Sequence, residues 1–184
     1  MTRTLTTLSA VLLLALAVTF LFGWLSFFAD PTSVLKKDLF LIHFSLGLLS
    51  ALGALLVHCL IFTYFLGTGR WVKEVGIAYS LPDEFWPRET RELKRKVFPP
   101  ALYAMLITIA TVAAGAGSQL RVWHWSIHLT LATLTLLINL WAFGVEFRTV
   151  SRNAAIIGEV MEEVDRIRAA RGLPSNAEAL QELR

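Results

Sequence analysis

Imidazole side chains provide the clearest chemical lead in this chain. Four histidines lie within or at the ends of long apolar segments: His43, His58, His124 and His128. A neutral imidazole binds a metal ion or a haem iron through one ring nitrogen, and it exchanges protons near neutral pH. Ionisable side chains are costly in the apolar part of a membrane and usually serve a function there. The histidines are therefore the first candidates for a functional site.

Two predicted helices must position His43 and His128. His43 lies about five residues into a helix that begins near Asp38, and His128 about six residues into one that begins near Val122. As the second and fourth of four antiparallel spans, these helices run in the same direction, so the two histidines are expected at one depth. Two neutral imidazoles on different helices at one depth can hold a haem b between them. We predict this pair as haem ligands.

A stripe of small residues separates the two histidines of the second helix. Steps of four, three, four and four residues from His43 reach Gly47, Ser50, Ala54 and His58, so these positions share one face. Small residues allow the close approach of another helix or of the flat face of a macrocycle. Gly47, Ser50 and Ala54 are therefore predicted as packing positions or haem contacts.

The spacing of His43 and His58 resembles that of paired haem-ligating histidines on one helix of the cytochrome b family. The four-helix plan is also similar to the haem-bearing membrane anchors of respiratory dehydrogenases. This resemblance covers the helices only and implies haem-mediated electron transfer. A second haem of that pattern needs a histidine within residues 139–143, which contain none. Met105 is expected at the depth of His58 and is the substitute ligand we consider, with helix packing as the other role for both residues.

A zinc or copper site is an alternative use of the same histidines. His124 and His128 are four residues apart and share a helix face, and His43 would supply a third imidazole. Asp38 is the nearest carboxylate for a fourth position. A third alternative is that no cofactor is bound.

Composition places the chain in a membrane. Hydrophobic residues make up 55% of its 184 residues, charged residues only 17%, and the mean hydropathy is +0.60. A helix needs roughly 20 apolar residues to span a bilayer. Four segments meet this length: residues 5–28, 39–66, 97–116 and 122–147. We predict an all-α fold in which residues 1–150 form a four-helix transmembrane bundle and residues 151–184 an amphipathic helical tail.

The distribution of lysine and arginine predicts the orientation. Seven lie in residues 68–96, predicted as a basic loop, six follow Phe147, and only three lie in the other two turns. Basic residues in short loops favour the cytoplasmic side, so both termini are expected in the cytoplasm of a bacterial-type inner membrane. This arrangement explains the sequence pI of about 9.3 without nucleic acid, and it makes the lipid bilayer, with its anionic headgroups, the expected partner.

Helix boundaries and single polar residues lead to further expectations. Gly67 to Gly69 should end the second helix, and Pro99 and Pro100 should begin the third. Cys59 is expected to be buried and Glu146 to be solvated at the inner edge of the fourth helix.

The fourth helix and the tail carry further polar and amphipathic features. Asn139 is expected to form an interhelical hydrogen bond. In the tail, residues 154–170 have helical apolar spacing, so their apolar face should rest on this protein, on the membrane or on a partner subunit. Ser175 should cap a short final helix.

The sequence lacks the usual hydrolase, protease and nucleotide-binding motifs, so we do not expect a catalyst that acts by itself. The function predicted first is an integral membrane subunit that binds haem b and transfers electrons, or serves as an anchor, within a larger membrane complex. A quinone is a candidate redox partner. The alternative is a cofactor-free structural or assembly subunit, and the third interpretation is the zinc or copper site on the periplasmic side.

Overall fold

The computed structural model describes residues 2–82 and 85–182, and within them it contains helices and no strand. The helices are α1 (Thr2–Phe28), α2 (Val34–Tyr79), α3 (Trp86–Gln119), α4 (Trp125–Ala170) and α5 (Asn176–Glu182). The first four are long and apolar enough to cross a membrane. The predicted all-helical fold with four helices able to span a membrane is confirmed.

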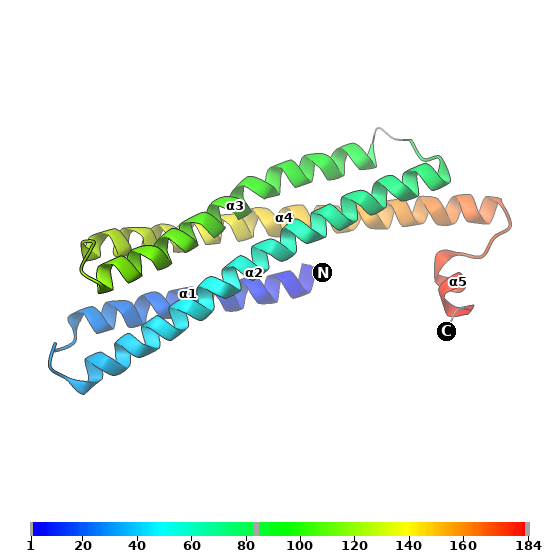
Figure 1. Cartoon of the computed structure of the whole chain (residues 1–184). Coiled ribbons are helices and arrows are strands. Elements are labelled where there is room, and N and C mark those ends of the chain that lie inside the picture. The colour runs from blue at the N-terminus through cyan, green and yellow to red at the C-terminus, as the bar shows by residue number, and fades with distance from the viewer. Residues whose placement is uncertain (1, 83–84, 183–184) are drawn as a thin grey trace.

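Two helical hairpins form the bundle (Figure 1). The first is α1 with α2 and the second is α3 with α4, and the turns within both hairpins lie at the same end of the molecule. Helix α1 has 27 residues whereas α2 and α4 have 46 each. At about 1.5 Å per residue, the longer helices reach about 69 Å, more than twice the hydrocarbon core of a bilayer. Beyond the start of α1, the helices α2, α3 and α4 therefore continue outside the apolar layer as a three-helix extension.

The helix boundaries correct three sequence-based predictions. Most of the predicted basic loop is helical, because α2 continues through residues 67–69 to Tyr79 and α3 begins at Trp86. Pro99 and Pro100 lie inside α3 rather than at its start. The apolar pattern ends at the membrane boundary, but the helices do not, because Val72 and Leu93 still pack into the buried cluster of the extension.

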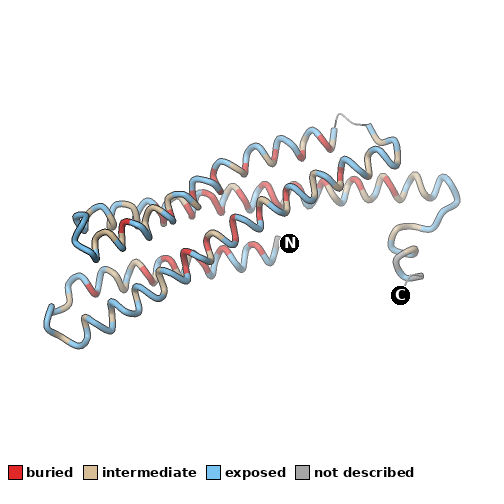
Figure 2. The backbone as a smooth tube through the Cα atoms, viewed as in Figure 1, coloured by how far each residue is buried: buried red, intermediate tan, exposed pale blue. Residues whose placement is uncertain are grey.

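Buried residues line the facing sides of the helices along the bundle and the extension (Figure 2). Large apolar side chains also cover the outside of the spans, among them Leu49 and Leu56, which are 65% and 61% exposed. An apolar surface of this extent fits contact with lipid. Cys59 is exposed as well, which corrects its predicted burial. It follows the buried His58 directly, and successive residues of a helix point about 100° apart.

The amphipathic tail continues α4 and packs against this chain's own helices. Ile156, Val160 and Val164 are buried in the core cluster. The apolar face of residues 154–170 is thus covered without a partner subunit. Helix α4 ends before Gly172, whose φ of 68° is a left-handed conformation that glycine adopts readily.

A short final helix follows, as predicted. Ser175 and Glu178 cap α5 reciprocally: the Ser175 N–H donates to Glu178 Oε2 over 2.8 Å, and the Glu178 N–H donates to Ser175 Oγ over 3.3 Å.

Charged residues tie α3 to α4 in the extension. The Arg152 guanidinium donates to Glu89 through Nε (2.6 Å) and Nη2 (2.8 Å), and to Glu159 through Nη1 (2.6 Å). Trp86 Nε1 also donates to Glu159. The hydrogen bond from Arg152 lowers the pKa of Glu159. This network fixes how the two helices align beyond the membrane.

Candidate functional site

His43 of α2 and His128 of α4 meet near the end of the bundle that carries the two hairpin turns. Their ring centres are 6.0 Å apart and the ring planes are inclined by 75°. Both side chains are half-buried. The two rings lie side by side as predicted, but the predicted helix starts near Asp38 and Val122 are wrong, because α2 begins at Val34 and α4 at Trp125.

Backbone carbonyl groups anchor both rings. His43 Nδ1 lies 2.8 Å from the Thr19 carbonyl oxygen of α1, and His128 Nδ1 lies 3.1 Å from the Thr111 carbonyl oxygen of α3. Because a carbonyl only accepts, each Nδ1 carries the hydrogen, and in a neutral ring the lone pair belongs to Nε2. Neither Nε2 has a hydrogen-bond partner within the described part of the chain. Metal-binding imidazoles are held in this way.

A glycine of a neighbouring helix makes room for each ring. A Cβ atom on Gly23 of α1 would lie 2.7 Å from His43 Cε1, and one on Gly115 of α3 would lie 3.0 Å from His128 Cε1. Any larger residue at these positions would displace the imidazoles. Neither glycine could be predicted from the sequence, since which glycine faces which ring depends on the packing of the helices.

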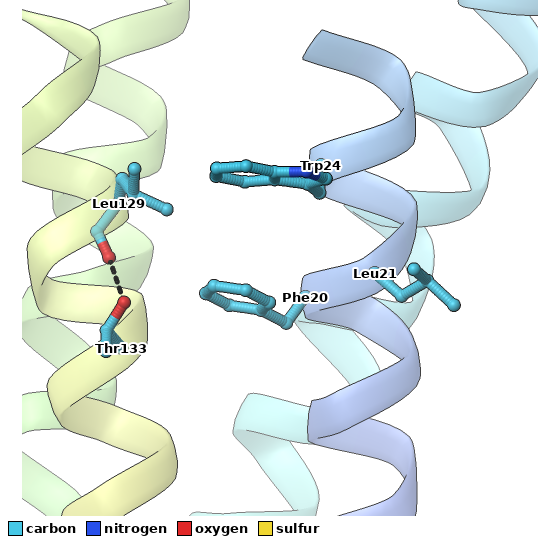
Figure 3. Close-up of a pocket in the computed structure, with 5 residues that line it drawn as sticks. All are labelled: Phe20, Leu21, Trp24, Leu129 and Thr133. Carbon is cyan, nitrogen blue, oxygen red and sulfur yellow. Dashed lines mark hydrogen bonds between the residues drawn. The ribbon is translucent and has the colours of Figure 1, made fainter. Parts of the chain in front are cut away.

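An apolar groove of about 460 Å³ lies between α1 and α4, and neither His43 nor His128 is among the described residues that line it (Figure 3). Phe20 and Trp24 extend from α1 towards α4, with ring centres 6.5 Å apart and planes only 11° from parallel. Leu129 and Thr133 form the opposite wall, and Leu129 directly follows His128. The Thr133 hydroxyl donates to the Leu129 carbonyl over 2.9 Å, so this wall presents few free polar groups.

The small-residue stripe of α2 serves helix packing. A Cβ atom on Gly47 would lie 3.5 Å from Thr19 Cγ2 of α1, and the hydroxyls of Ser50 and Thr19 lie 3.4 Å apart. Ala54 is fully buried in the core cluster. Gly47 and Ser50 thus allow α1 to approach α2. Of the two interpretations of the stripe, the close approach of a helix is the one observed.

A second polar cluster occupies the core of the bundle. His58 of α2 lies between two residues of α4: its Nδ1 is 2.6 Å from Glu146 Oε1, and its Nε2 is 3.1 Å from Asn139 Oδ1. All three residues have no exposed surface. The Phe143 ring stacks on the imidazole with centres 5.1 Å apart and planes inclined by 13°. This confirms the predicted interhelical hydrogen bond of Asn139.

The hydrogen-bond geometry determines how many protons this cluster holds. Asn139 Nδ2 donates to the Thr135 carbonyl over 2.9 Å, so Asn139 Oδ1 must accept from His58 Nε2. The short His58–Glu146 contact then contains one proton, which sits either on His58 Nδ1 or on Glu146 Oε1. The pair has zero net charge in both cases. A neutral pair is the arrangement that costs least in an apolar layer.

The core cluster changes the interpretation of two residues. Glu146 is fully buried rather than solvated, and its Oε2 has no partner among the described residues. Both nitrogens of His58 have partners, so a second haem site with Met105 would lack a free imidazole nitrogen. The seven-residue spacing of Asn139 and Glu146 was the available sequence signal, because it places both on one face of α4.

His124 lies apart from the pair, at the start of α4. It is the N-cap residue, and its Nδ1 lies 3.4 Å from the Ser126 amide and 2.8 Å from the Ser126 hydroxyl. No group of three or more His, Cys, Asp or Glu side chains that could hold a metal ion occurs in residues 2–82 and 85–182. The alternative site of His43, His124 and His128 is therefore not assembled in this arrangement.

No protein family, curated protein or solved structure matches this chain.

Proposed function

We propose that this protein is a membrane-embedded haem b subunit that transfers electrons within a larger complex, in which His43 and His128 would hold the haem iron. The observation that supports this proposal is the pairing of two anchored imidazoles whose ring centres are 6.0 Å apart. Metal–imidazole bonds are about 2.0 to 2.1 Å long, so two imidazoles must come this close to each other if they are to hold one metal ion.

The residues around the two histidines also fit a bound haem b. The Thr19 and Thr111 carbonyls hold both rings in the tautomer that leaves Nε2 available for iron. Gly23 and Gly115 let the two rings pack closely against α1 and α3. The groove formed by Phe20, Trp24 and Leu129 offers an apolar wall for a flat macrocycle.

The chain itself would hold and orient the haem and shield it from water. A bound haem b would supply one-electron transfer, while the carbonyl anchors and glycines keep the imidazoles in place and the apolar side chains keep water away. The proposed setting is a bacterial-type inner membrane with both termini in the cytoplasm. The proposed partners are other membrane subunits and a quinone.

Optical spectroscopy of single-histidine variants tests this function. The protein purified in detergent from haem-replete cells should show the absorbance bands of a b-type cytochrome. His43→Ala and His128→Ala should each abolish these bands, whereas the control His124→Ala should retain them, because His124 only caps α4. A colourless wild-type protein would contradict the proposal.

A cofactor-free structural subunit is the second candidate. It is favoured by the small-residue stripe, since Gly47 and Ser50 pack α2 against α1. A colourless protein that co-purifies stably with other membrane subunits would support this candidate over the first.

A further inference from the structure

A second groove, of about 440 Å³, lies between α2 and α3 at the end of the apolar spans. Its volume falls within the range of about 300 to 1,000 Å³ that is typical of ligand sites. Phe65 and Leu66 form its apolar end, where the apolar run of α2 stops. Four cationic residues form its other end: Arg70, Lys73, Arg91 and Lys94. The groove is therefore apolar towards the membrane interior and basic towards the aqueous phase.

The positive charge of this groove is largely unbalanced. Arg70 pairs with Glu74, but Lys73, Arg91 and Lys94 have no carboxylate partner within the described residues. Lys94 is also half-buried. The acidic residues of α3 are engaged elsewhere, with Glu89 bound to Arg152 of α4 and Glu92 to Arg88. Three cations thus share one groove without an internal counter-ion.

A buried hydroxyl group also borders the groove. Thr90 is only 2% exposed, and its Oγ1 has no hydrogen-bond partner in the described part of the chain. A buried hydroxyl without a partner is unfavourable unless a bound group satisfies it. Gly69 of α2 faces it, since a Cβ atom there would lie 3.4 Å from Thr90 Cγ2. The groove therefore combines cations with a free hydrogen-bond donor, the set that recognises a phosphate group.

We propose that this groove binds the headgroup of an anionic phospholipid. The phosphate lies among Lys73, Arg91 and Lys94 with Thr90 at its edge, and the acyl chains run past Phe65 and Leu66. A lipid fits better than a free phosphate ion because the groove is amphiphilic and opens where the spans end. This proposal is independent of the haem site.

Lipid retention by the purified full-length protein tests this proposal. The probes are phosphatidylglycerol, phosphatidylcholine and inorganic phosphate, each added to delipidated protein in detergent, with bound lipid counted by native mass spectrometry. The test variant is Lys73→Gln/Lys94→Gln. The control Lys36→Gln/Lys37→Gln makes the same change in charge at the opposite end of α2. Thr90→Val removes the hydroxyl and keeps the shape of the side chain.

The wild type and the control should retain one phosphatidylglycerol in preference to phosphatidylcholine. Each removed lysine should weaken this binding about fivefold, and Thr90→Val should weaken it roughly two- to tenfold. Equal retention of both lipids, or unchanged retention by the double variant, would overturn the proposal. So would inorganic phosphate that displaces the lipid and stabilises the protein equally well, because the ligand would then be a free anion.

Discussion

His58 Nδ1 and Glu146 Oε1 lie 2.6 Å apart in the core of the bundle, on helices α2 and α4, with neither side chain exposed. The residues are 88 positions apart in the sequence. Asn139 and Phe143 enclose the imidazole from the same helix. The pair therefore determines how α2 and α4 face one another.

Replacing Glu146 separates its hydrogen-bonding role from its volume. Glu146→Leu leaves His58 Nδ1 buried without a partner and should lower the free energy of unfolding by about 2 to 4 kcal/mol. In Glu146→Gln the amide can donate to His58 Nδ1, so the loss should stay below about 1 kcal/mol. Thermal unfolding in detergent measures both. Equal melting temperatures for the two variants would contradict this role of the hydrogen bond.

Alanine at Gly23 should disturb His43. Its Cβ atom would lie 2.7 Å from His43 Cε1, so the ring must move away from the Thr19 carbonyl. We expect a loss of about 1 to 3 kcal/mol of stability. Gly67→Ala is the matched control, because that position in α2 has open space and alanine there should stabilise by roughly 0.5 to 1 kcal/mol. Melting temperatures that rise in both variants would show that the glycine is not needed for the ring.

The Arg152 network predicts a pH dependence of stability. The hydrogen bond from Arg152 lowers the pKa of Glu159 below its ordinary value of 4.5. A lowered carboxyl pKa stabilises the fold at pH values above 4.5, and this contribution is lost as the pH falls through the folded-state pKa. Arg152→Met removes the two partly exposed ion pairs of Arg152, and the loss of each should lower the free energy of unfolding by up to about 1 kcal/mol.

The free energy of unfolding, measured between pH 7 and pH 3, checks this prediction. The difference in free energy of unfolding between the wild type and Arg152→Met should become smaller below pH 4.5. Arg70→Met is the control, since its pair with Glu74 is 81% and 59% exposed and should contribute little at any pH. A difference in free energy of unfolding that stays constant from pH 7 to pH 3 would contradict the contribution of Glu159.

The depth of the histidines could be predicted, but their partners could not. His43 and His128 meet because α2 and α4 run in the same direction, although α2 begins at Val34 and α4 at Trp125, so the two histidines do not lie equally far into their helices. The fit of each ring against Gly23 or Gly115 depends on how neighbouring helices are rotated about their axes. That rotation follows from the packing of many side chains at once.

The sequence by itself determined a four-span helical membrane protein with a helical tail, because apolar length and helical periodicity are local properties of a segment. Only the tertiary structure decided that α2 and α3 continue beyond the membrane as an extension with α4, and that His58 contacts Glu146 and Asn139. These features depend on contacts between residues far apart in the chain. Local patterns do not encode which faces of the helices meet.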